Sequence, residues 1–300
     1  MLSRVADSLF WMSRYLERGE HTARVLNVQL YLMLERGAGS DERHWERVRR
    51  SLGVEVEPEA PPELASSIVD CITLARENAR QVREQISSEM WEQLNRLFHA
   101  VKRADPAGDA RDFLRAIQDG AHSFQGITDS TMTHGEGWQF IQAGRYLERA
   151  MALSTLVSVH FREFYHEAEA EAEVEPLEWI GLLQSCTAFE AYCKAYTADL
   201  RPDRIAEFLV LNAVFPHSIR FSADALATSL KQIGREGRPG AQVERIAGRM
   251  QSTLEFGQMD EIMTAGLQGY LDTVRRQCVQ VYSAVYQTYV SYPVEAALGG

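Results

Sequence analysis

The sequence predicts an all-α fold, a mostly antiparallel bundle of about ten to eleven helices. Apolar residues recur at alternating spacings of three and four through most of the 300-residue chain. Runs of alternating β-branched residues, which would predict strands, are essentially absent. The breaks are short and rich in glycine and proline, which favours antiparallel neighbours in space. The chain is long enough for a sizeable core, and we expect a single domain over residues 1–300.

In the first part of the chain, the sequence predicts five helices and three clear breaks. The breaks lie at residues 37–40, 58–62 and 105–108. The helices between them are expected at residues 3–36, 42–51, 63–86, 88–103 and 109–126. Ser3 and Ser40 fit N-cap positions, and Pro62 fits a first helical turn.

The second part of the chain is divided in the same way. Its breaks lie at residues 133–137, 167–175, 201–202, 215–216 and 234–240. The helices between them are expected at residues 136–168, 177–199, 203–214, 222–233, 239–256 and 259–290, with Ser222 as an N-cap. The break at residues 167–175 carries five glutamates that repel one another. We expect a solvated segment there rather than an ion site.

Composition excludes several classes of function. The net charge of -11 argues against a nucleic-acid partner, which needs a basic surface. The sequence has no apolar run long enough to cross a membrane and begins without an apolar signal region, so we expect a cytoplasmic protein. Four cysteines without Cys-x-x-Cys spacing are expected to be small buried apolar residues in a reducing compartment.

One five-residue string, Arg-Tyr-Leu-Glu-Arg, occurs twice, at residues 14–18 and 145–149. Each copy lies in a long helical pattern that is apolar on two opposite sides, which indicates burial on both sides. We therefore expect Arg14, Glu17 and Arg18 to lie under neighbouring helices. The repeat also suggests two related halves, residues 1–130 and 135–300, that meet where their motif helices cross.

The two strings together bring four arginines and two glutamates into a buried space. This leaves surplus positive charge that a carboxylate or phosphate would neutralise, and a guanidinium binds such groups in bidentate fashion. The expected anion-binding residues are Arg14, Arg18, Arg145 and Arg149. Glu17 and Glu148 would orient them, and either would serve as a catalytic general base if burial raised its pKa. The alternative is that the ion pairs only fix helix register.

Other chemistries have weaker support in the sequence. Pairs with metal-ligand spacing occur at Glu163/His166 and Asp119/His122, but a carboxylate-bridged di-metal bundle needs further glutamates. His217 and Ser218 are adjacent without an identifiable third catalytic partner. No glycine-rich phosphate loop is present. We therefore expect no metal and no cofactor in this chain.

Several stretches of the chain resemble the bacterial Alpha-E family, named for its helical content and its Glu-Arg motif. Residues 1–24 closely resemble the start of that family. The resemblance continues, in consistent order, through residues 83–95, 129–133, 144–149, 185–192 and 208–220. His134 and Lys194 depart from the family pattern, which usually has arginine at these places, and either change could alter the charge of a shared pocket.

The resemblance implies partners and a biochemical setting. Proteins of this family are typically encoded beside, or fused to, a circularly permuted ATP-grasp protein, often with a transglutaminase-like protease. This implies a role in ATP-dependent amide or peptide bond formation on an anionic or peptidic substrate, with ATP and Mg on the partner. Asp129, Thr131, Ser218 and Arg220 lie in the resembling stretches and complete the candidate binding set. We expect Asp129 or Thr131 to hydrogen-bond into the buried site; the alternative is that they only cap a helix.

Overall fold

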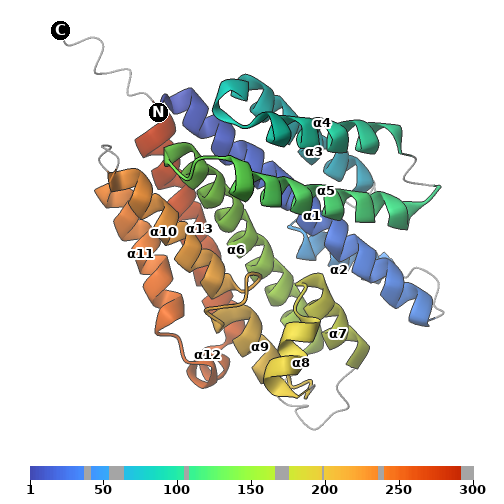
Figure 1. Cartoon of the computed structure of the whole chain (residues 1–300). Coiled ribbons are helices and arrows are strands. Elements are labelled where there is room, and N and C mark those ends of the chain that lie inside the picture. Colours follow the sequence, from blue (N-terminus) through green and yellow to red (C-terminus); the bar gives the residue numbers. More distant parts are fainter. Residues whose placement is uncertain are drawn as a thin grey trace.

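The computed structural model describes residues 1–36, 42–53, 64–104, 108–165, 176–197, 199–235 and 240–291. Within these ranges the chain forms thirteen α-helices and no strand, which confirms the all-α fold (Figure 1). None of these helices is long and apolar enough to cross a membrane. The expected caps Ser40 and Pro62 lie outside the described residues.

The first part of the chain forms five helices close to the expected ranges. They are α1 Ser3–Arg36, α2 Glu42–Ser51, α3 Leu64–Gln81, α4 Ser88–Arg103 and α5 Ala110–Thr131, with a short 3-10 turn η1 at Arg83–Gln85. Ser87 caps α4 by accepting a 3.1 Å hydrogen bond from the Met90 amide. Ser3 is the first helical residue of α1 rather than its N-cap.

The second part contains more helices than the sequence predicts. They are α6 Glu136–Phe164, α7 Pro176–Ser185, α8 Phe189–Tyr196, α9 Pro202–Leu211, α10 Ile219–Arg235, α11 Ala241–Glu255, α12 Met259–Ala265 and α13 Leu267–Val285, followed by a wide turn η3 at Tyr286–Val290. The helix expected at 177–199 is divided at Thr187, whose φ is 51°. The helix expected at 259–290 is divided at Gly266, whose φ of 105° favours glycine.

The start of α10 differs from the expected N-cap at Ser222. The cap is Ser218, whose Oγ accepts a 3.0 Å hydrogen bond from the Phe221 amide. Ser222 lies inside the helix and donates its hydroxyl to the Ser218 carbonyl. The prediction was wrong because the capping serine occurs one turn earlier in the sequence.

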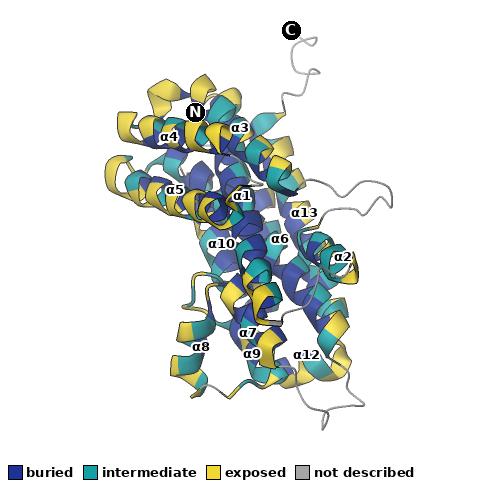
Figure 2. Cartoon of the chain, turned by 90° about the vertical axis from the view of Figure 1, so that its right-hand side faces the viewer, coloured by how far each residue is buried: buried dark blue, intermediate teal, exposed yellow. Residues whose placement is uncertain are grey.

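Each motif helix belongs to a ring of four helices. In one ring α1, α3, α4 and α5 pack in sequence around a shared interior, and α5 returns to α1. In the other ring α6, α10, α11 and α13 do the same. The rings are joined mainly by the packing of α1 along α6. Helix α6 occupies the buried centre of the molecule (Figure 2).

The close approach of α1 and α6 depends on Gly144. A Cβ atom at this position would collide with the Phe10 carbonyl oxygen and with Ser13 Oγ of α1. The smallest residue therefore stands directly before the second Arg-Tyr-Leu-Glu-Arg string, where the two helix backbones nearly touch.

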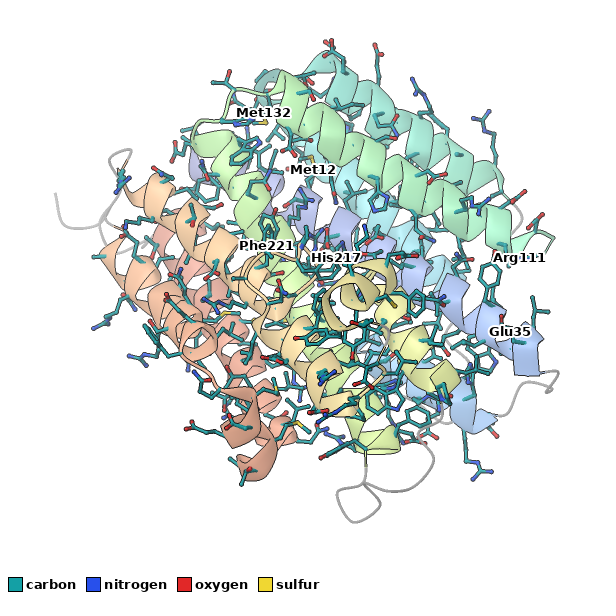
Figure 3. All side chains as sticks on the ribbon, turned by 60° about the horizontal axis from the view of Figure 1, so that its bottom comes forward. Met12, Glu35, Arg111, Met132, His217 and Phe221 are labelled. Atoms are coloured by element: carbon teal, nitrogen blue, oxygen red, sulfur yellow. The ribbon has the colours of Figure 1, made fainter. Side chains whose placement is uncertain are left out.

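A segment between α6 and α10 covers part of this crossing. It consists of α7, α8 and α9 with their connections, and α7 packs on both α1 and α6. The loop from α9 to α10 carries His217, which lies near the middle of the molecule with Phe221 close by (Figure 3). In the described part of the chain, the first ring has α2 at the corresponding place.

Candidate functional site

The two Arg-Tyr-Leu-Glu-Arg strings meet where α1 and α6 cross, as the sequence predicts. Each glutamate pairs with arginines of the other string. We call Glu148 with Arg14 and Arg18 the Glu148 cluster, and Glu17 with Arg145 and Arg149 the Glu17 cluster. The pairing explains how six ionisable side chains fit between the helices, because each carboxylate lies between two guanidinium groups.

In the Glu148 cluster both arginines are closely paired with the carboxylate. Arg14 Nε donates to Glu148 Oε2 at 2.7 Å, and Arg18 Nε donates to Glu148 Oε1 at 2.6 Å. The Arg14 guanidinium also lies over the rings of Trp11 and Tyr282, at 4.6 and 5.0 Å. Arg14 is buried, but the Arg18 side chain is 43% exposed, so the expectation of burial was wrong for Arg18.

Glu148 does not have the raised pKa that a general base would need. Burial raises the pKa of Glu148, but the neighbouring charges of Arg14 and Arg18 outweigh this effect and lower the pKa below its usual value. Glu148 therefore remains ionised at neutral pH and orients the two arginines.

In the Glu17 cluster the two arginines are unequally paired. Arg149 donates from Nε and Nη2 to the two carboxylate oxygens of Glu17, at 2.6 and 3.0 Å, and from Nη1 to the Pro216 carbonyl at 3.1 Å. Arg145 Nε lies 3.9 Å from Glu17 and has no hydrogen-bond partner although it is buried. Burial and the charge of Arg149 lower the pKa of Arg145.

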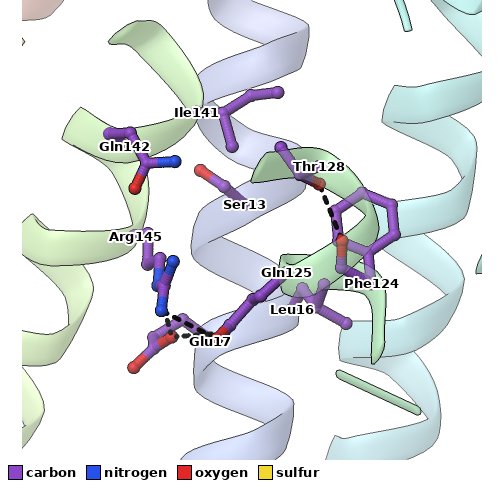
Figure 4. Close-up of a pocket in the computed structure, with 9 residues that line it drawn as sticks. All are labelled: Ser13, Leu16, Glu17, Phe124, Gln125, Thr128, Ile141, Gln142 and Arg145. Atoms are coloured by element: carbon purple, nitrogen blue, oxygen red, sulfur yellow. Dashed lines mark hydrogen bonds and ion pairs between the residues drawn. The ribbon is translucent and has the colours of Figure 1, made fainter. Parts of the chain in front are cut away.

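A small cavity lies beside Arg145, between α1, α5 and α6 (Figure 4). Gln125 bridges its wall by accepting from Arg145 Nη2 at 2.8 Å and donating to Glu17 Oε2 at 3.3 Å. The cavity measures about 10 Å³, which is about the space that one water molecule needs. It is lined by Ser13, Leu16, Glu17, Phe124, Gln125, Thr128, Ile141, Gln142 and Arg145. This cavity therefore does not accommodate a metabolite as it stands.

The polar face of α1 continues for two turns beyond the string. Arg24 donates to both carboxylate oxygens of Glu20, at 2.9 and 3.1 Å, and its Nη2 lies 3.4 Å from His21 Nδ1. A further Arg24 nitrogen donates to the Ser185 carbonyl at the end of α7. Glu20, His21 and Arg24 share a face with Glu17 because they follow it at helical spacings. The sequence therefore contained a signal for these three residues, but the predicted site residues on this helix ended at Arg18.

The two candidates that precede α6 lie at the edge of this site. Asp129 Oδ1 accepts from Trp138 Nε1 at 3.3 Å and from Gln142 Nε2 at 3.4 Å, so it reaches the cavity only through Gln142. Thr131 is exposed, donates to the Ile127 carbonyl and contacts Ser87 Oγ at 2.7 Å. The structure does not bring Thr131 to either cluster.

Ser218 and Arg220 stabilise the connection between α9 and α10. Ser218 donates to the Asn212 carbonyl in addition to capping α10. Arg220 Nη1 donates to the Leu211 carbonyl at 3.5 Å, and its Nε lies 3.8 Å from Asp224. These contacts account for Ser218 without a ligand, whereas Arg220 Nε is buried without a hydrogen-bond partner.

The other sequence candidates are placed elsewhere. No group of three His, Cys, Asp or Glu side chains that could bind a metal occurs among the described residues. Of the pairs with metal-ligand spacing, His122 lies 3.7 Å from Glu20, and His166 falls outside the described part of the chain. His134, a departure from the family pattern, stacks on Trp138 at the surface.

This geometry defines a helical domain built around two crossed helices with reciprocal Glu-Arg pairs. A family model named Alpha-E, described as a predicted alpha-helical domain with a conserved ER motif, matches residues 1–290. The chain belongs to the Alpha-E family.

The curated proteins that resemble this chain have names that state no activity. Uncharacterized proteins of Mycobacterium bovis and of two Mycobacterium tuberculosis strains are each 25% identical over 313 residues. Each match covers 89% of this chain and 34% of the relative, so the chain spans about a third of the length of these relatives. No solved structure matches the chain.

Proposed function

We propose that this chain is the helical partner subunit of an ATP-grasp-type amide or peptide ligase system. In this proposal it binds an anionic or peptidic substrate or intermediate at the Glu17 cluster, while the partner supplies ATP, Mg and the activation of a carboxylate. The ligase setting rests on the family resemblance described above. The greater length of the mycobacterial relatives is compatible with a fused partner domain, since two thirds of each lies outside the match.

The observation that carries the binding proposal is the incomplete pairing of Arg145. Four arginines face two glutamates, and the surplus charge is concentrated where Arg145 makes only a 3.9 Å ion pair and leaves Nε without a partner. A buried donor without an acceptor is unfavourable, and an incoming carboxylate or phosphoryl oxygen would satisfy it.

The residues would then have different tasks. Arg14, Arg18 and Glu148 stabilise the helix crossing, because each Glu148 oxygen accepts a short hydrogen bond from one of the arginines. Glu17 orients Arg149 through two hydrogen bonds, and Arg145 with Arg149 binds the anion. Proton transfer would fall to the partner, since Glu148 has a lowered pKa and both Glu17 oxygens accept hydrogen bonds from Arg149.

A second candidate is a non-catalytic interaction module whose Glu-Arg pairs only fix helix packing. It is favoured by the reciprocal pairing of both glutamates and by the size of the cavity beside Arg145, about 10 Å³. In that case removal of any buried arginine would weaken the fold, and no ligand would depend on Arg145.

The test compares Arg145→Met with Arg162→Met, an exposed arginine on the same helix. A tagged chain is first captured from its native host to identify the ATP-grasp partner. ATP turnover by the purified complex is then measured with host small-molecule extract, alongside thermal melting. We expect Arg145→Met to melt like the wild type and to lose turnover, with Arg162→Met unchanged in both.

Two outcomes would count against the proposal. Full turnover with Arg145→Met would remove the anion-binding role, and capture without any ATP-grasp protein would remove the ligase setting. A large loss of stability in Arg145→Met would instead favour the interaction module.

A further inference from the structure

Three polar atoms without a hydrogen-bond partner belong to residues that contact Arg24 or lie within reach of its charge. They are His21 Nε2, Ser185 Oγ and His217 Nδ1, and all three are buried in the described structure. His21 and Ser185 both contact Arg24 directly, and the Arg24 charge also acts on His217. Buried polar groups are normally paired, so these three atoms are hydrogen-bonding groups that a ligand would satisfy.

The proton position on His21 follows from its neighbour. Arg24 can only donate, so His21 Nδ1 accepts, and in the neutral ring the proton is on Nε2. The ring is neutral because burial and the Arg24 charge lower the His21 pKa to about 3. The unpaired His21 Nε2 is therefore an N–H donor, and the Ser185 hydroxyl is a second donor without an acceptor.

The surroundings of these donors are positively charged. Burial and the charges of Arg149, Arg24 and Arg145 lower the pKa of His217 well below its usual value. Glu20 and Glu17 pair with Arg24 and Arg149, but Arg145 remains under-neutralised. Donors in a positive environment suit an oxyanion and exclude a cation.

We propose that His21, Ser185 and His217 form an internal binding site for a small oxyanion, a carboxylate or a phosphoryl group, beside Arg24 and Arg149. The inference rests on the proposed function and deepens it. It places the anionic group of the ligand on the side of the Glu17 cluster that faces the segment between α6 and α10.

Binding of two probes, inorganic phosphate and acetate, to the full chain tests this site. Isothermal titration is done at constant ionic strength for the wild type, Ser185→Ala, His217→Leu and Arg145→Met, with exposed His99→Gln on α4 as the control. Ser185→Ala is the cleanest variant, because its Oγ has no partner and its loss should not unfold the chain. We expect saturable 1:1 binding of at least one probe, weakened about tenfold or more by each site variant and unchanged by His99→Gln.

The outcomes separate this inference from the proposed function. If Arg145→Met abolishes binding while Ser185→Ala and His217→Leu bind normally, the ligand lies at the Glu17 cluster and the inference is wrong. If only the latter two variants lose binding, the inference stands and the role of Arg145 fails. No saturable binding of either probe by the wild type would overturn the inference. Binding of phosphate alone or acetate alone identifies the group that the site accepts.

Discussion

Arg14 and Arg145 occupy the same place in two copies of one string, yet their surroundings differ. Arg14 donates to Glu148 at 2.7 Å and lies against aromatic rings, whereas Arg145 remains 3.9 Å from Glu17 with an unpaired Nε. The local sequence is identical in both copies, so their difference comes from what packs around each. Packing completes the hydrogen bonds of one copy, and the other leaves a buried Arg145 nitrogen without a partner.

The difference between the two copies coincides with a difference between the two rings. Only the second half inserts α7, α8 and α9 after its motif helix, and this segment brings Ser185, Pro216 and His217 to the Glu17 side. The Glu148 side instead receives Tyr282 from α13. We infer that the shared crossing is scaffold and that the inserted segment adds the ligand side.

The largest expected effect is on protein stability, when the two matched arginines Arg14 and Arg145 are replaced. Arg14→Met removes a guanidinium that pairs with the buried Glu148 carboxylate, and should cost about 3–5 kcal/mol of unfolding free energy. Arg145→Met relieves surplus charge and should change it by less than about 1 kcal/mol. Urea denaturation of both variants measures the difference. Equal losses would show that the two copies are energetically equivalent.

The next effect concerns the contact between the two motif helices. Gly144→Ala places a methyl group against the Phe10 carbonyl oxygen, which forces α1 and α6 apart and should cost about 1–3 kcal/mol. Gly126→Ala is the matched control on α5, where nothing lies within 4 Å of the added atom. The control should gain about 0.5–1 kcal/mol from helix propensity. A Gly144→Ala protein as stable as the control would disprove the close crossing.

A smaller effect per residue concerns the pH dependence of stability. Burial lowers the pKa values of His21 and His160 to about 3 from 6.5, so both are neutral in the folded protein and protonated in the unfolded one between these pH values. Each therefore lowers the unfolding free energy by about 1.4 kcal/mol per pH unit as the pH falls below 6.5. His160→Phe should make the pH dependence of the unfolding free energy weaker by about 1.4 kcal/mol per pH unit, measured by urea denaturation between pH 6.5 and 5. An unchanged slope would mean that His160 is not buried and neutral.

An added anion should affect the protonation of His21 but not that of His160. An oxyanion at the proposed site favours protonation of His21 but is remote from His160, which packs between Phe164 and Trp179. Phosphate should therefore offset part of the stability loss at low pH in His160→Phe as well as in the wild type. No added stability in phosphate at pH 5.5, against sodium chloride of equal ionic strength, would contradict this linkage.

Much of the scaffold could be predicted from the sequence because it depends on local periodicity. The three-and-four spacing of apolar residues gives α1 its burial on two sides, and two-sided burial indicates that Arg14 and Glu17 are covered. Periodicity does not reveal which edge of the crossing remains open. The exposure of Arg18 is set by neighbours that are distant in the chain.

The breaks and the added polar groups were harder to predict. Thr187 adopts a left-handed conformation that threonine seldom takes, so its sequence gives little indication that the helix expected at 177–199 ends there. Ser185 contacts Arg24 across 161 residues of sequence, and His217 comes within reach of the Arg24 charge, where no spacing rule applies. Their convergence depends on how the inserted segment folds back on α1.

The most direct test of the asymmetry between the two sides is an NMR titration of the histidine side chains. Long-range ¹H–¹⁵N correlations should first show His21 protonated at Nε2, as its contact with Arg24 requires. On addition of inorganic phosphate at constant ionic strength, His21 and His217 should shift together and saturate with one dissociation constant, while His160 and His99 remain in place. Unchanged His21 and His217 resonances, or equal shifts at all four histidines, would contradict the assignment of the ligand to the Glu17 side.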